Sequence, residues 1–130
     1  MLIYYMNNRC KIIIKNFEIL VGLKNNATAK KIWDSLPIQS KVKIWGEEVY
    51  FYTSIDTPRE SDAKEVINFG ELAFWPEGKA IAIGFGKTPV SLGEEIRLAA
   101  RCNIWGTTEF NLKKLKEIND GELIKIEKLL

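Results

Sequence analysis

The sequence contains no histidine, and it has only two cysteines, Cys10 and Cys102. Without an imidazole, the chain lacks a histidine-dependent nucleophile triad and a histidine metal centre. Two thiols alone do not complete a structural zinc site, and no clustered acidic spacing suggests another metal. The two cysteines lie far apart in the chain, so we expect two free thiols in a reducing cytoplasm, with no metal and no cofactor.

Long hydrophobic runs and an excess of charge of one sign are also absent. The apolar start, residues 1–6, is interrupted by Asn7, Asn8 and Arg9, which makes it too short for a secretory signal or a membrane span. The 19 basic and 17 acidic side chains are interspersed, without the basic stripe that nucleic-acid-binding proteins use. We therefore expect a cytoplasmic protein that binds neither membranes nor nucleic acid.

A strong hairpin signal is present between residues 70 and 91. Two apolar extended segments flank a Pro-Glu-Gly turn at residues 76–78, and a second turn follows at residues 86–89. In the second segment, large residues alternate with small ones, namely Ile81, Ile83 and Phe85 with Ala80, Ala82 and Gly84. Because successive strand residues point to opposite faces, one face is bulky and the other nearly bare, an alternation used in small closed barrels.

Further short runs of β-branched and aromatic residues predict strands at residues 11–15, 17–21, 41–45, 49–52, 100–105 and 122–127. Apolar residues at helical spacing predict a helix over residues 27–35, with Asn26 or Thr28 as its cap and Pro37 beyond its end.

A second amphipathic helix is predicted near residues 112–118, and a capping box from Ser91 to Glu94 predicts a short helical turn. The segment from residue 54 to residue 68, which is polar over residues 56–64, is expected to be a loop. About eight strands and two helices predict a mainly β, single-domain protein over residues 1–130. Its expected architecture is a closed antiparallel barrel with helices covering the open ends.

Four segments carry a resemblance to known proteins: WGEEVYF at 45–51, GELAFWPEGKA at 70–80, FGKTP at 85–89 and LKEINDG at 115–121. They resemble a small prokaryotic cyclophilin-like family, found in archaea and thermophilic bacteria and left largely without an assigned function. The resemblance runs from Lys11 onward and leaves residues 1–10 as an N-terminal extension. It implies an eight-stranded cyclophilin-type barrel.

Cyclophilins include peptidyl-prolyl isomerases, so the resemblance also implies isomerase activity as an alternative. An isomerase needs an arginine over the prolyl nitrogen and carbonyl to weaken the partial double bond. In true isomerases that arginine follows a Phe-His pair, and a Phe-x-x-Gln-Gly-Gly stretch lines the groove. The comparable strand here is Val49-Tyr-Phe-Tyr52, and the loop after it carries Arg59 but no Gln-Gly-Gly. No catalytic residue is therefore transferred to this chain.

The remaining site candidates are aromatic and polar residues near the predicted turns. Arg101 shares a strand face with Trp105, where a guanidinium beside an indole can hold a carboxylate or a carbonyl, although all four arginines can equally be surface charges. We predict a groove between the hairpin turn and residues 86–91. Its candidate binding residues are Tyr52, Trp75, Phe85, Thr88, Arg101 and Trp105.

This groove is expected to bind a peptide segment or a small molecule without isomerase chemistry, and a divergent peptidyl-prolyl isomerase is the alternative. Glu47 and Glu48 are adjacent and point to opposite faces of a strand, so they do not form an acid–base pair and are assigned to a hairpin turn. A monomer and a homodimer both fit the sequence, since closure of a barrel removes free strand edges.

Overall fold

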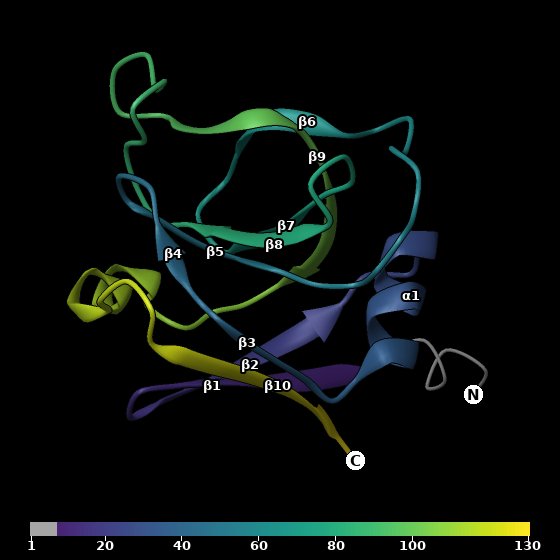
Figure 1. Ribbon diagram of the computed structural model, residues 1–130. Coiled ribbons are helices and arrows are strands. Elements are labelled where there is room, and N and C mark those ends of the chain that lie inside the picture. The colour runs from purple at the N-terminus through teal and green to yellow at the C-terminus, as the bar shows by residue number, and fades with distance from the viewer. Residues whose placement is uncertain (1–7) are drawn as a thin grey trace.

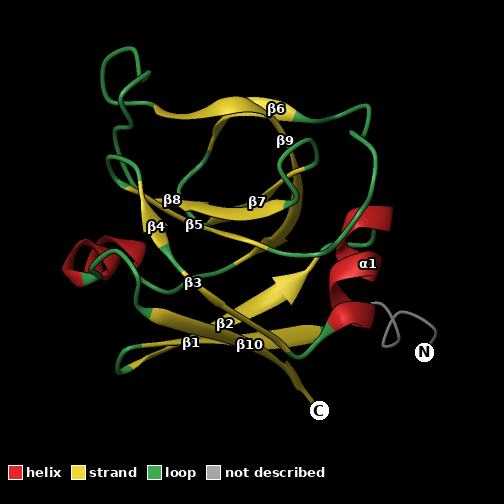
Figure 2. Ribbon diagram, viewed as in Figure 1, coloured by secondary structure: helices red, strands yellow, loops and turns green. Residues whose placement is uncertain are grey.

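The computed structural model describes residues 8–130, and its architecture is mainly β (Figures 1 and 2). In chain order the elements are β1 (Arg9–Ile14), β2 (Phe17–Leu23), α1 (Ala27–Ser35), β3 (Ile38–Lys41), β4 (Lys43–Ile44), β5 (Glu48–Tyr52), β6 (Lys64–Ile67), β7 (Glu71–Trp75), β8 (Ala80–Gly84), β9 (Ile96–Thr107), the 3-10 helix η2 (Leu112–Glu117) and β10 (Leu123–Leu129). No helix within residues 8–130 is long and apolar enough to cross a membrane.

The sheet closes because its two end strands belong to one stretch of chain. Antiparallel strands pair in the order β3-β10-β1-β2-β9-β7-β8-β5-β4. Only Val42 separates β3 from β4, and its N–H donates to the carbonyl of Glu122 at 2.9 Å. With β3 and β4 taken as one strand and β6 outside the path, eight strands surround the barrel. The predicted cyclophilin-type barrel is confirmed.

Large apolar side chains fill the barrel interior. Phe51, Phe74 and Ile81 come from neighbouring strands and are fully buried there. Trp105 of β9 is also fully buried, and its Nε1 donates to the carbonyl of Ala73 at 3.2 Å. Burying one such side chain contributes about 1.5–3 kcal/mol, so this interior is the main source of stability.

The predicted helix at residues 27–35 forms with these bounds and packs against β9. The Oδ1 atom of Asn26 caps it by accepting from the N–H of Ala29 at 2.8 Å, and the Asn26 Nδ2 donates to the carbonyl of Ile104 at 2.9 Å. The second predicted helix is a six-residue 3-10 helix, capped by Asn111. Figure 2 shows the two helices on opposite sides of the barrel.

A second, smaller layer lies outside the barrel wall, where β6 pairs with the first half of β9 (Figure 1). Strand β6 lies within residues 54–68, which the sequence predicts as loop, and β9 extends over Ile96–Thr107, beyond the predicted strand at residues 100–105. Apolar residues from both layers form a separate small core: Ile67, Ala73, Ala82, Ile96, Leu98, Cys102 and Ile104.

Two further expectations differ from the structure. The helical turn predicted at Ser91 does not form. The Ser91 hydroxyl accepts from the N–H of Thr88 at 2.9 Å and from the N–H of Arg97 at 3.4 Å, so it does not cap a helix. Strand β1 begins at Arg9, inside the segment assigned to an N-terminal extension, and pairs from there with β10. The apolar start of the chain, residues 1–6, lies outside the described residues.

Candidate functional site

A pocket of about 290 Å³ lies between the outer face of the barrel wall and the first half of β9. Its lining comes from β5, β7, β8 and β9 with one residue of the turn before β5: Trp45, Glu48, Tyr50, Tyr52, Trp75, Ala80, Ala82, Leu98, Ala99, Ala100 and Cys102. Strand β9 comes close to the wall at Gly84, where a Cβ atom would lie 2.6 Å from the Ile96 side chain. The pocket therefore lies between two layers of the fold.

The pocket exists because large residues of β5 face small residues of β8. Tyr50 is paired in register with Ala82, and Tyr52 with Ala80. All four side chains lie on the outer face, since strand residues two apart share a face. The face of the hairpin that carries only small residues is therefore the floor of a pocket on the outer side of the barrel wall.

Aromatic rings form much of the lining. The rings of Tyr50 and Tyr52 meet edge to face, with centroids 5.8 Å apart, and Tyr52 is 48% exposed. Trp75 lies over the hairpin turn, where a Cβ atom on Gly78 would come within 2.2 Å of the indole ring. Glycine at this position allows the indole to lie flat on the turn beside the pocket.

Among residues 8–130, Glu48 is the only charged residue that lines the pocket. It begins β5, is only 6% exposed, and its Oε1 atom has no hydrogen-bond partner among the described residues. Burial raises the pKa of its carboxyl from 4.5 to about 7. A buried, unpartnered acid with a perturbed pKa in a pocket is the pattern expected of a functional residue.

Cys102 lies in the same pocket, on β9. Burial, with a smaller contribution from the charge of Glu48, raises the pKa of its thiol to about 12, so the thiol stays protonated and unreactive at neutral pH. Both cysteines are free, as expected, and both are buried. Residues 8–130 contain no group of three or more Cys, Asp or Glu side chains that could hold a metal ion.

Sequence reasoning missed Glu48, because it assigned both adjacent glutamates to a turn. That role fits Glu47, whose Oε1 accepts from the N–H of Lys87 at 3.1 Å and whose carbonyl accepts from Phe85 at 2.8 Å. Glu48 belongs to the strand instead. The spacing in the sequence indicates this placement, because Glu48, Tyr50 and Tyr52 are two residues apart along one strand and so share one face.

Of the six predicted binding residues, the structure brings Tyr52 and Trp75 together at the pocket. Phe85 and Trp105 point into the barrel interior, on the bulky face of their strands. Thr88 is buried, and Arg101 is exposed away from the pocket lining. The hollow next to Trp75 lies under β9 and not beside residues 86–91, which do not line it.

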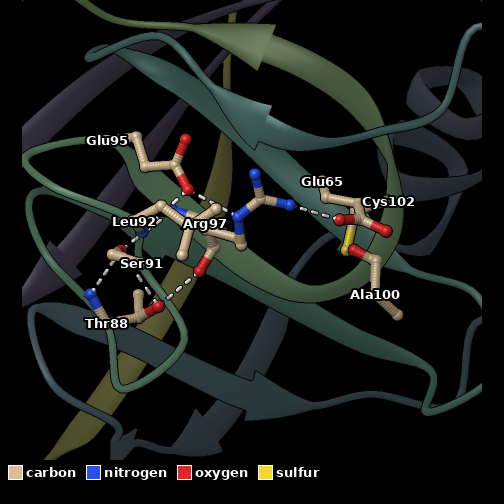
Figure 3. A network of polar contacts seen from close by, with 8 residues as sticks. All are labelled: Glu65, Thr88, Ser91, Leu92, Glu95, Arg97, Ala100 and Cys102. Atoms are coloured by element: carbon tan, nitrogen blue, oxygen red, sulfur yellow. Dashed lines mark hydrogen bonds and ion pairs between the residues drawn. The ribbon is translucent and has the colours of Figure 1, made fainter.

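The loop before β9 is held by a polar network around Arg97, shown in Figure 3. The guanidinium of Arg97 pairs with Glu65 of β6 at 2.6 Å and with Glu95 at 2.5 Å. The Thr88 hydroxyl donates to the carbonyl of Arg97. The hydrogen bond from Arg97 lowers the pKa of Glu95. This arginine is thus engaged in structure, and none of the four arginines lines the pocket.

The chain belongs to the cyclophilin-like family, since the model of that family, described as Cyclophilin-like, matches residues 8–127. It is similar to the solution structure of the hypothetical protein AF2241 from Archaeoglobus fulgidus, with 36% identity, a TM-score of 0.81, and coverage of 95% of this chain and 96% of that one. No curated protein matches the chain.

A second similar structure is that of McbB in complex with tryptophan, with 16% identity and a TM-score of 0.59. The match covers 91% of this chain and 44% of McbB. At this identity the likeness is one of fold alone.

Proposed function

We propose that this protein is a binding barrel that holds a small molecule, or a short peptide segment, in the pocket under β9 without prolyl isomerase chemistry. The main support for this proposal is the pairing of Tyr50 and Tyr52 with Ala82 and Ala80, which leaves the pocket between two layers of the fold. Such a cavity, largely apolar and with few polar groups, is typical of a preformed ligand site.

The charge of the pocket supports binding over isomerisation. An isomerase needs a preorganised cation over the prolyl amide, and the single charged lining residue here is the acid Glu48. Two of the arginines are already paired, Arg59 of the loop before β6 with Glu77 at 2.9 Å and Arg97 of β9 with Glu65 at 2.6 Å.

Fragment screening by NMR tests the proposal. We expect fragments to shift the amide signals of Tyr52, Trp75 and Ala100 together. The variant Ala100→Trp places a large side chain in the pocket lining and should abolish these shifts. Its matched control is Ala63→Trp, the same substitution at another half-buried alanine, which lies outside the pocket lining and should retain them. Shifts confined to residues far from the pocket would overturn the proposal.

The isomerase alternative is tested by a protease-coupled assay on Ala-Pro peptides. We expect no acceleration above the uncatalysed rate. A rate enhancement that disappears in Arg101→Ala would contradict a binding role and support a divergent isomerase.

A further inference from the structure

We infer that the ligand of this pocket carries a positively charged nitrogen, a primary ammonium group, and that the carboxylate of Glu48 is its counter-charge. The inference rests on the proposed function and names the ligand class. It starts from Glu48, which is only 6% exposed and lines the pocket. Its Oε1 atom has no hydrogen-bond partner within residues 8–130.

An unpartnered buried oxygen is unfavourable, since a lost hydrogen bond inside a protein costs about 1–3 kcal/mol. The residues around Glu48 do not supply a cation. The other titratable groups of the lining are Tyr50 and Tyr52 on its own strand and Cys102 on β9, and a phenol or a thiol carries no positive charge in either of its forms. Burial raises the pKa of Tyr50 and of Cys102 further. No lysine or arginine within residues 8–130 lines the pocket. A cationic group on the ligand would supply the partner that the described residues do not.

The surroundings favour a cationic partner over a neutral donor. Four aromatic residues line the same pocket: Trp45, Tyr50, Tyr52 and Trp75. The faces of such rings attract an ammonium group by about 0.5–2 kcal/mol. A neighbouring positive charge also stabilises the ionised form of a carboxyl. An anionic ligand would meet a buried acid of the same sign and gain none of these contacts.

Binding of an ammonium group should also release a proton. Near pH 7 the free protein holds Glu48 in a mixture of protonated and ionised forms, because the pKa of its carboxyl is about 7. The ammonium keeps its three protons and selects the ionised carboxylate, so the carboxyl proton passes to the buffer. At pH 7 we expect about half a proton released for each ligand bound.

The test compares three probes of one carbon skeleton by titration calorimetry: 2-phenylethylammonium, the neutral 2-phenylethanol and the anionic phenylacetate. We expect the ammonium to bind about tenfold or more tightly than the alcohol, a difference of about 1.4 kcal/mol. Repeating the titration in two buffers of different ionisation enthalpy counts the released protons. The variant Glu48→Gln should bind ammonium and alcohol alike, whereas Glu47→Gln, changed in the turn beside it, should keep the wild-type preference.

The outcomes separate the two proposals. Equal binding of ammonium and alcohol, or tighter binding of phenylacetate, would overturn the inference and leave the proposed function standing. Failure of all three probes would overturn the inference, while the fragment screen still decides the proposed function. If Glu48→Gln does not fold, the two-buffer titration of the wild-type protein decides alone, because a cation that binds without releasing a proton contradicts the role of Glu48.

Discussion

The inside of the barrel and the layer outside its wall share strands β7, β8 and β9. They differ in how tightly their side chains pack and in whether their buried polar groups have hydrogen-bond partners. Inside, large apolar side chains fill the space, and the indole N–H of Trp105 has its acceptor. Outside, small residues leave a hollow, and the buried acid Glu48 has an oxygen without a partner. The interior supplies stability, and the outer layer retains an unsatisfied polar group of the kind found at functional sites.

The largest effect should come from truncating the interior. We expect Phe51→Ala to lower the free energy of unfolding by about 3–5 kcal/mol, because it leaves a cavity among fully buried side chains. Tyr52→Ala, on the next residue but on the pocket face, should lower it by less than about 1 kcal/mol. Urea denaturation of both variants measures the difference. Similar losses for the two would contradict a division between structural and functional faces.

Second in size is the pH dependence that Glu48 gives to stability. The unfolded chain releases this proton near pH 4.5 and the folded chain near pH 7, so the folded protein binds more protons between these values. Its contribution is fully present below pH 4.5 and is lost as the pH rises through about 7. The loss amounts to about 3 kcal/mol. Urea denaturation at pH 5 and pH 8 should show most of this drop in the wild-type protein.

The same measurement on Glu48→Gln should lack that part of the pH dependence, because the amide does not titrate. Glu47→Gln serves as the control and should keep the wild-type drop. A wild-type protein as stable at pH 8 as at pH 5 would contradict an unpartnered acid in the outer layer.

A smaller effect is expected at the hairpin turn. Gly78→Ala places a methyl group 2.2 Å from the indole of Trp75, so the ring must leave its place beside the pocket. We expect a changed tryptophan fluorescence spectrum, weaker binding of the probes and a stability loss of about 1–3 kcal/mol. Gly22→Ala is the control, since a Cβ there meets no atom within 4 Å. An unchanged spectrum in Gly78→Ala would show that the Trp75 indole does not lie over the turn at Gly78.

The smallest change should follow Arg97→Gln, which breaks the ion pairs that tie the loop before β9 to β6. Exposed ion pairs contribute little to global stability. We expect the overall stability to change little and the amide of Thr88 to exchange its hydrogen faster. Unchanged exchange there would show that the loop is held by its other contacts.

The sequence predicted the barrel well because local alternation and turn chemistry determine it. The hairpin around residues 76–78, the helix at 27–35 and the inward direction of Ile81 and Ile83 all follow from local patterns. Strand β6 was missed because its pairing with β9 joins residues about thirty apart in the chain, and no turn signal connects them.

The site was harder to predict than the fold. Alternation shows which residues share a strand face, but not which face is covered by a second layer. Tyr52 and Trp75 were therefore named together with Phe85 and Trp105, which point to the opposite side of the wall. Glu48 is buried in a pocket that it shares with residues of β9, and no local pattern contains this proximity of distant segments.

The most direct test of the account is an NMR titration of the Glu48 side-chain carboxyl carbon, with and without 2-phenylethylammonium. The account predicts a pKa of about 7 in the free protein and a lower pKa when the ammonium is bound. A pKa near 4.5 in the free protein that does not move with the probe would contradict it.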